Sequence, residues 1–295
     1  MRSLCEIQEG YMDFMGYKTW FRIAGNDQSK KVPLLVLHGG PGSCHNYLTS
    51  LDGLTEYGRK VIYYDQIGCG KSSVPDGKIQ WNEQIFLEEL KQLRKFLKLD
   101  KVHILGQSWG GMLGMEYMEQ EPEGVVSFVI ASSPASMKRW QEETRELVKL
   151  LPKEDIKAIQ TAEEKKNYDT QEYQKANEKF FMRHVCSLDP MPEQVAYSMN
   201  SHTECYEQMI GPSEFTITGN LKEWDIQKDL GKIQVPVLIT SGTMDEATPF
   251  MMKEIQEKIP KSRWELLKGT HLVHWEQKEI YNPLIENFLE ETERI

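Results

Sequence analysis

The sequence predicts an α/β fold in which a mostly parallel sheet carries helices on both faces and a helical cap is inserted into the chain. Two observations support this fold. Short apolar segments alternate with helical patterns between residues 32 and 133, and the alternation returns after residue 235. Between these regions, charged helical patterns replace the apolar segments. Such alternation indicates a parallel sheet with covering helices, and 295 residues suffice for one large domain of this kind.

The apolar segments of the first half are nearly continuous, which is typical of strands buried on both faces of a sheet. They cover residues 32–37, 60–64, 102–105 and 126–130. Between the second and third strands, residues 82–99 have the pattern of a helix. Its apolar side is formed by Ile85, Phe86, Leu90, Leu93 and Leu97. This helix is the expected crossover between parallel strands, and residues 19–23 are predicted to form an edge strand.

The middle of the chain has a different residue pattern. From residue 137 to residue 211, helical segments rich in Glu and Lys, such as 141–151 and 170–184, replace the strand patterns. We therefore assign residues 137–211 to a helical cap, and residues 1–136 and 212–295 to the α/β core. The second part of the core is expected to contribute strands at 235–240 and 263–267 and an amphipathic helix at 276–290.

Composition and charge exclude several classes of protein. There are 35 Lys and Arg residues against 45 Asp and Glu residues, and the net charge of −10 repels nucleic acids and anionic membranes. The longest apolar run, at residues 34–37, is far shorter than a membrane-spanning helix. The first residues lack the apolar core of a secretory signal, so the cytoplasm is the expected compartment.

The cysteine pattern indicates neither disulfides nor a thiolate zinc site. The cysteines are odd in number, widely spaced and form no C-x-x-C pair. They are Cys5, Cys44, Cys69, Cys186 and Cys205.

Ser108 is the candidate nucleophile. It stands in Gly106-Gln107-Ser108-Trp109-Gly110-Gly111, directly after the strand at 102–105 and before a helical pattern at 112–119. A serine on such a strand-to-helix turn projects its hydroxyl above the sheet, and the flanking glycines let the backbone turn without collision. The strand and the helix on either side distinguish this G-x-S-x-G motif from a chance glycine-rich turn.

A serine hydroxyl needs a base to remove its proton and a carboxylate to orient that base. Asp245 follows the strand at 235–240, and His271 follows the strand at 263–267. Both therefore lie at the carboxyl edge of the sheet, where open α/β sheets carry their sites. These positions predict a catalytic triad of Ser108, His271 and Asp245.

The competing residues are less well placed. His274 is farther from the strand end than His271, and Asp225 and Asp229 precede the strand that Asp245 follows. A helix cap or a solvated charge is the expected role of those two aspartates.

Acyl transfer also needs hydrogen-bond donors for the oxygen that becomes negative in the tetrahedral intermediate. The loop His38-Gly39-Gly40-Pro41-Gly42 follows the first core strand and exposes backbone N–H groups. We expect the N–H groups of Gly40 and of Trp109, the residue after the nucleophile, to form the oxyanion hole. A phosphate-binding loop is the alternative, but the pattern is not G-x-G-x-x-G and Pro41 removes a donor.

No metal or cofactor is predicted. Gly70-Lys71-Ser72 resembles the end of a P-loop, but Asp65 occupies the position of the required earlier glycine. His271 and His274 have no third ligand nearby and do not belong to an H-E-x-x-H motif.

With these residues in place, the sequence resembles the proline iminopeptidase (prolyl aminopeptidase) family of serine peptidases, which have the α/β-hydrolase fold. The resemblance extends from about Tyr17 to the C-terminus. It rests on His38-Gly39-Gly40-Pro41-Gly42, Tyr64-Asp65-Gln66, Gly68-Cys69-Gly70-Lys71-Ser72, Gly106-Gln107-Ser108-Trp109-Gly110-Gly111, Gly211-Pro212-Ser213-Glu214-Phe215, Asp245-Glu246-Ala247-Thr248-Pro249, and His271-Leu272 before Trp275-Glu276. One position departs from the family pattern, since Ile67 stands where many members carry Arg.

The resemblance implies an activity and two further site residues. Members of the family release an N-terminal residue, often proline, from short peptides. Glu214, at the end of the cap, and Glu246, beside Asp245, match the acids that hold the free α-amine of the substrate. Two carboxylates facing a desolvated ammonium would form charge-assisted hydrogen bonds and reject blocked N-termini. The expected partners are short peptides or amino-acid amides with a free N-terminal amine, and neither nucleic acid nor a membrane.

Two alternative functions stay open. An L-amino-acid amidase or aminoacyl esterase would use the same triad and amine-binding acids on a substrate with a small leaving group. A ligand-binding protein that kept the hydrolase scaffold without turnover is the alternative from another class, because fold does not dictate function.

Overall fold

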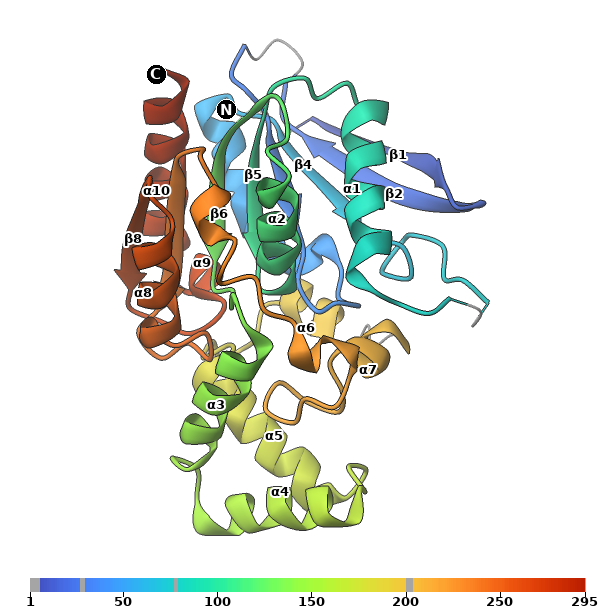
Figure 1. The fold of residues 1–295 in the computed structure, drawn as a ribbon, viewed down its shortest axis with the longest axis vertical. Coiled ribbons are helices and arrows are strands. Elements are labelled where there is room, and N and C mark those ends of the chain that lie inside the picture. Colours follow the sequence, from blue (N-terminus) through green and yellow to red (C-terminus); the bar gives the residue numbers. More distant parts are fainter. Residues whose placement is uncertain (1–5, 27–29, 77–78, 200–203, 295) are drawn as a thin grey trace.

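The computed structural model describes residues 6–26, 30–76, 79–199 and 204–294. Its centre is an eight-stranded sheet with the strand order β1-β2-β4-β3-β5-β6-β7-β8 (Figure 1). Strands β3 to β8 are parallel to one another, whereas β2 joins β4, and β1 joins β2, in antiparallel pairs. The strands are β1 (Ile7–Phe14), β2 (Tyr17–Ala24), β3 (Leu34–Leu37), β4 (Val61–Asp65), β5 (Val102–Gln107), β6 (Val125–Ala131), β7 (Val237–Gly242) and β8 (Ser262–Leu267). This sheet, with its covering helices, confirms the predicted α/β fold.

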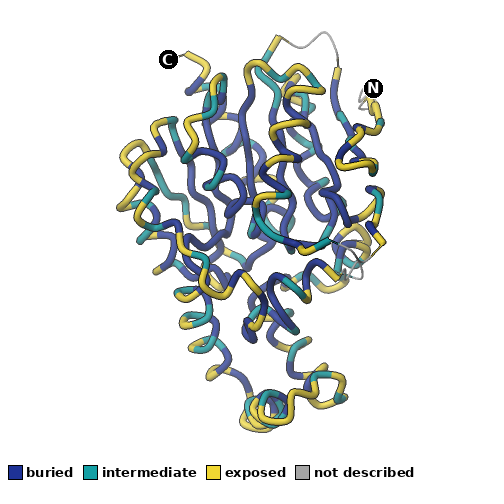
Figure 2. The backbone as a smooth tube through the Cα atoms, turned by 45° about the vertical axis from the view of Figure 1, so that its right-hand side comes forward, coloured by how far each residue is buried: buried dark blue, intermediate teal, exposed yellow. Residues whose placement is uncertain are grey.

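The strands bury alternate side chains in two core layers, one on each face of the sheet. In β3, Leu35 and Leu37 belong to one layer, whereas Leu34 and Val36 belong to the other. Because both faces are covered, these strands read as continuous apolar runs. The covering elements are α1 (Glu83–Phe96), α2 (Trp109–Glu119) and α8 (Pro249–Lys258) for the first layer, and the 3-10 helix η1 (His45–Tyr57) and α10 (Lys278–Glu293) for the second. Figure 2 shows the strands buried at the centre and exposed residues on the outer helices and loops.

The N-terminal strands form a hairpin, which corrects the prediction of an edge strand at residues 19–23. That segment lies in β2, between β1 and β4, and β1 is the edge strand. Met15 and Gly16 form the turn, both with positive φ, as a two-residue hairpin turn requires. Only Met12 and Phe14 of β1 are buried, so most of this strand has no apolar signal in the sequence.

A helical segment separates β6 from β7. Its α-helices are α3 (Met137–Val148), α4 (Lys153–Lys165), α5 (Gln171–His184), α6 (Glu193–Met199) and α7 (Glu204–Met209). The Ser136 side chain caps α3 by accepting the Arg139 N–H, and the Thr170 side chain caps α5 in the same way. In Figure 1, α3, α4 and α5 extend beyond the sheet at the lower end of the view.

The C-terminal region differs slightly from the predicted helix at 276–290. It forms a short helix, α9 (Val273–Glu276), and then α10, with Gln277 between them. A membrane-spanning helix is absent from the described part of the chain. Cys44, Cys69, Cys186 and Cys205 are buried and form no disulfide with one another, and Cys5 lies outside the described residues.

Candidate active site

Ser108 occupies a strained turn between β5 and α2. Its backbone has φ 56° and ψ −125°, a conformation that residues with a side chain rarely adopt. The glycines of the motif permit the turn. A Cβ atom on Gly106 would lie 2.2 Å from the Gly110 carbonyl oxygen, and one on Gly110 would lie 2.1 Å from the Leu37 carbonyl oxygen. The G-x-S-x-G pattern therefore has a steric cause in this fold.

His271 and Asp245 lie side by side in the loops that follow β8 and β7. The His271 Nδ1 atom is 2.8 Å from Asp245 Oδ1, and both side chains are buried. Because a carboxylate only accepts hydrogen bonds, this contact assigns the ring proton to Nδ1 and leaves Nε2 as a base. Trp140 of α3 packs edge-on against the imidazole, with ring centroids 6.0 Å apart.

Backbone and hydroxyl donors hold the Asp245 carboxylate. The Ser132 hydroxyl donates to Oδ2 at 2.6 Å, and the Gly242 N–H donates to the same atom at 3.2 Å. The Ala247 N–H donates to Oδ1 at 2.8 Å. The carboxylate is therefore fixed in the orientation that meets His271. Neither Ser132 nor its bond to Asp245 was predicted, because no local pattern links residues so distant in the sequence.

The competing residues have other partners. His274 is buried against the Ser50 hydroxyl at 2.8 Å, and burial lowers its pKa to about 3. Asp225 accepts the Gln227 N–H, and Asp229 pairs with Lys232. None of these three residues lines the cavity that Ser108 and His271 share.

That cavity has a volume of about 420 Å³ and lies between the sheet edge and the inserted helices. Ser108, His271, Glu214 and Glu246 all line it. The Ser108 hydroxyl makes no hydrogen bond to another described residue in this structure, and such bonds commonly tighten only when substrate is bound. The arrangement places the candidate nucleophile, the candidate base and two acids around one space large enough for a small ligand.

The candidate oxyanion donors are arranged around the same turn. Gly40 lines the cavity and has φ 111°, and a Cβ at this position would lie 2.6 Å from the Gly42 nitrogen. Trp109 is the first residue of α2, so its N–H has no partner within the helix. Within the described ranges, neither the Gly40 N–H nor the Trp109 N–H donates to another residue of the protein.

Glu246 is a buried carboxylate with one oxygen atom that no described residue satisfies. Its side chain is buried, and its Oε2 atom has no hydrogen-bond partner among the described residues. Its Oε1 atom lies 3.7 Å from His271 Nε2. Burial, and then the neighbouring Glu214 and Asp245 carboxylates, raise the pKa of Glu246 well above its ordinary value. A cationic group in the cavity would relieve both the burial penalty and the repulsion.

Glu214 faces the same cavity from the segment after α7. The Tyr206 hydroxyl of α7 donates to its Oε1 atom at 2.7 Å, and the Trp140 indole N–H donates to its backbone carbonyl at 2.7 Å. These bonds hold the carboxylate beside Glu246. Sequence reasoning missed Tyr206, since its only signal is proximity to Glu214 along the chain.

Ile67, the position that departs from the family pattern, is buried in the core. Its N–H donates to Glu89, and its side chain does not line the cavity. The departure therefore changes packing beneath the site and leaves the lining of the cavity intact.

Comparisons with known proteins agree with this geometry. A family model described as the alpha/beta hydrolase fold matches residues 32–278. The chain is 43% identical over 291 residues to a proline iminopeptidase of Lactobacillus helveticus, an alignment that covers 97% of this chain and 99% of that protein. It is also similar to the solved structure of VinJ, at 38% identity and a TM-score of 0.93 over 97% of this chain and 99% of that one. The proline iminopeptidase of Mycobacterium smegmatis superposes with a TM-score of 0.88 at 35% identity, over 97% of this chain and 98% of that one. The chain therefore belongs to the proline iminopeptidase family of α/β hydrolases.

Proposed function

We propose that this protein is a serine aminopeptidase that releases an N-terminal residue, preferentially proline, from short peptides. The observation that carries this proposal is the buried Glu246 carboxylate, which lines the same cavity as Ser108 and His271 and whose Oε2 atom has no hydrogen-bond partner among the described residues. An ordinary esterase needs no buried acid beside its nucleophile. An aminopeptidase needs one, because it must recognise the positive charge on the free amine of its substrate.

The proposed reaction has two stages. His271 Nε2 takes the proton from the Ser108 hydroxyl as the oxygen attacks the carbonyl carbon, and the N–H groups of Gly40 and Trp109 stabilise the oxyanion. Collapse of this intermediate forms an acyl-enzyme and expels the shortened peptide, whose amine receives the proton from His271. Water activated by His271 then releases the N-terminal residue. Asp245 keeps the imidazole in the required tautomer throughout.

Glu214 and Glu246 are proposed to bind the substrate amine. A desolvated primary or secondary ammonium between two carboxylates forms charge-assisted hydrogen bonds, which are stronger than neutral ones. An acetylated terminus would leave both acids without a counter-charge in a buried site, which is costly. The pair of Glu214 and Glu246, here called the amine clamp, therefore selects free N-termini. It accepts the secondary amine of proline because that amine still carries two protons when charged.

Residues 137–211 are proposed to act as a cap over a core made of residues 1–136 and 212–295. The helices of this segment supply much of the cavity wall, including Phe181 of α5, Met199 of α6 and Tyr206 of α7. The core supplies the nucleophile and the base. We infer that the cap sets the shape of the substrate pocket, so that short peptides and amino-acid amides with a free amine are accepted.

Turnover of L-proline 7-amido-4-methylcoumarin tests the nucleophile. Ser108→Ala is expected to lower kcat/KM by about 10⁴-fold or more. Ser127→Ala, which changes a buried serine bonded to His103 outside the cavity, is expected to stay within about threefold of wild type. Equal loss in both variants, or activity retained in Ser108→Ala, would contradict the proposed mechanism.

A substrate series tests the reaction class. Prolyl dipeptides, prolinamide and the same compounds with an acetylated nitrogen are compared by kcat/KM. The proposal predicts hydrolysis of free-amine prolyl peptides and rejection of every acetylated one. Strong preference for prolinamide over prolyl peptides would instead identify an amidase, and equal rates on free and acetylated substrates would remove the amine clamp.

A further inference from the structure

Tyr47, in η1, connects the two backbone segments on which the proposed chemistry depends. Its hydroxyl accepts the Gly39 N–H at 2.6 Å and donates to Gln107 Oε1 at 2.5 Å. Gly39 directly precedes Gly40, the proposed oxyanion donor. Gln107 directly precedes Ser108, the proposed nucleophile. A single hydroxyl therefore joins the residue before the oxyanion donor to the residue before the nucleophile.

The chain of contacts continues to the base. The Gln107 side-chain nitrogen lies 3.5 Å from the His271 carbonyl oxygen, toward which it donates. Gln107 is the variable residue inside the G-x-S-x-G motif, so the motif itself gives it no role. In this fold the oxygen of its side-chain amide accepts from the Tyr47 hydroxyl, and the nitrogen of the amide points to the His271 carbonyl.

The position of the Tyr47 ring does not depend on its hydroxyl. The Tyr47 N–H donates to the Ser198 hydroxyl of α6 at 3.0 Å, and the Trp275 indole N–H donates to the Tyr47 carbonyl oxygen. The ring packs near His274, with centroids 6.0 Å apart. Replacing tyrosine by phenylalanine therefore keeps the ring in place and removes only the two hydroxyl bonds.

The environment keeps this hydroxyl in its neutral form. The residue is 2% exposed, and burial raises the pKa of Tyr47 well above its ordinary value. The hydroxyl thus retains its proton for Gln107 while its lone pairs accept from Gly39. A phenol is suited to this bridge because it donates and accepts at one atom.

We propose that Tyr47 is a positioning residue that holds the Gly39–Gly40 segment in register with Ser108, so that the Gly40 N–H meets the oxyanion as it forms. This inference rests on the proposed function, since it assumes that Gly40 donates in the transition state. Oxyanion donors act through preorganisation, and a donor that must first be moved into place loses much of its effect. Tyr47 also lines the cavity, but Tyr47→Phe keeps the ring and Tyr47 has no charge to bind the amine, so we expect the substitution to affect catalysis more than ground-state binding.

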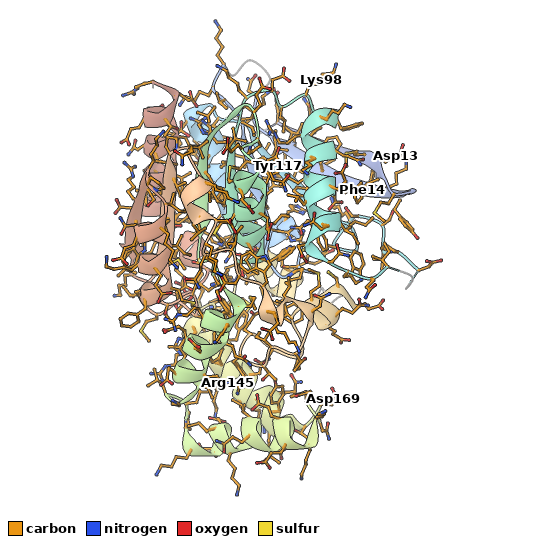
Figure 3. All side chains as sticks on the ribbon, viewed as in Figure 1. Asp13, Phe14, Lys98, Tyr117, Arg145 and Asp169 are labelled. Atoms are coloured by element: carbon orange, nitrogen blue, oxygen red, sulfur yellow. The ribbon has the colours of Figure 1, made fainter. Side chains whose placement is uncertain are left out.

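Tyr47→Phe is the first test. Its kcat for L-proline 7-amido-4-methylcoumarin is expected to fall about 10- to 100-fold, part of the effect of losing one oxyanion donor, while KM stays within about threefold. Tyr117→Phe is the matched control, because the buried Tyr117 hydroxyl accepts a bond from Arg94 at 2.6 Å and does not line the cavity. Figure 3 shows Tyr117 in the upper part of the molecule, away from Arg145 of α3 and from Asp169 in the loop between α4 and α5. Its kcat is expected to stay within about threefold of wild type.

Two inhibitors separate positioning from a general loss of structure. L-prolinal is an aldehyde to which Ser108 can add: the Oγ–C bond forms, the hydroxyl proton passes to His271, and the carbonyl oxygen becomes the oxyanion. L-proline cannot form this adduct. In Tyr47→Phe the inhibition constant for prolinal is expected to rise about 10-fold or more, whereas that for proline is unchanged. Parallel weakening of both inhibitors, or of neither, would overturn the assignment.

A double-mutant cycle with Gln107→Met provides the second variant. If the two side chains act through one bond, the losses in kcat for Tyr47→Phe and Gln107→Met are less than additive in the double variant. Full additivity would show that they act separately and would contradict the proposal. Wild-type enzyme that fails to hydrolyse the prolyl substrate would refute the proposed function, whereas an active wild type with an equally active Tyr47→Phe variant would refute only the role of Tyr47.

Discussion

Two buried glutamates differ in their surroundings, and we propose that one serves the structure whereas the other serves substrate recognition. Glu89, in α1, accepts the Ile67 N–H at 2.9 Å and is hydrogen-bonded to the Thr19 hydroxyl. Glu246, at the cavity, has an oxygen with no partner among the described residues. Both are almost fully buried, and burial raises the pKa of each.

The difference lies in where the donors come from. Protein groups satisfy Glu89, and this carboxyl links the β2 strand to the loop after β4. A carboxylate that the fold leaves unsatisfied is costly unless something else supplies the missing partner. Because Glu246 lines the cavity beside Ser108, we propose that the substrate amine supplies the missing partner.

The largest expected effect is on catalytic activity, which substitution of Glu246 should lower far more than substitution of Glu89. Glu246→Gln is expected to lower kcat/KM for free-amine prolyl substrates by about 100-fold or more, because a buried charge pair with the substrate is lost. Glu89→Gln keeps a polar side chain of similar shape away from the cavity and is expected to stay within about threefold. Steady-state kinetics on both variants checks this, and similar losses in the two variants would erase the distinction.

The second prediction concerns stability, where substitution of Glu89 is expected to have the larger effect. Glu89→Ala removes the acceptor for Ile67 and Thr19, and we expect the free energy of unfolding to fall by about 2 kcal/mol. Glu246→Ala deprives no described protein donor of its acceptor, so its change is expected to stay below about 1 kcal/mol. Urea denaturation at pH 7 measures both. A larger loss in Glu246→Ala would mean that Glu246 supports the fold.

The third prediction concerns pH. Burial raises the pKa of Glu89 from 4.5 to about 8, and its hydrogen bonds only partly offset this. The folded state then binds more protons than the unfolded state between these values, so the stability due to Glu89 is present below pH 4.5 and is lost as the pH rises through about 8.

The measurement is the difference in unfolding free energy between wild type and Glu89→Gln. Between pH 4.5 and about pH 8, the unfolding free energy of wild type is expected to fall relative to that of Glu89→Gln by about 1 kcal/mol per pH unit. Glu246 is present in both proteins, so its own titration cancels. A difference that does not vary with pH would contradict the raised pKa.

The smallest expected effect tests the hydrogen bond by which Tyr206 holds Glu214 in the amine clamp. Tyr206→Phe removes the hydroxyl that donates to Glu214 at 2.7 Å and is expected to lower kcat/KM about 10-fold, as for loss of a hydrogen bond to a charged group. The loss should appear mainly in KM and should be absent when Glu214 is already Gln. A loss that persists in the double variant would assign Tyr206 another role.

The sequence predicts the parts of this molecule that local patterns encode. The inner parallel strands β3 to β7 are largely apolar because both of their faces are covered, and the turn at Ser108 needs glycines for steric reasons. The N-terminal hairpin escaped prediction because β1 is an edge strand with only Met12 and Phe14 buried.

Side-chain networks were beyond the reach of sequence patterns. Tyr47 and Gln107 meet across 60 positions of the chain, and Ser132 and Asp245 across 113, so no periodicity reveals either pair. Glu214 and Glu246 were predicted to bind the amine only from the resemblance to a family. In the structure, the half-buried Glu214 and the buried Glu246 line one cavity, which supports that proposal on physical grounds.

The structure of Ser108→Ala with a bound prolyl dipeptide tests the central claim most directly. We expect the substrate nitrogen to lie within hydrogen-bond distance of Glu246 Oε2, with Glu214 on its other side and the scissile carbonyl oxygen toward the N–H groups of Gly40 and Trp109. A dipeptide bound with its carboxylate end beside Glu246, or with its amine in solvent, would contradict it.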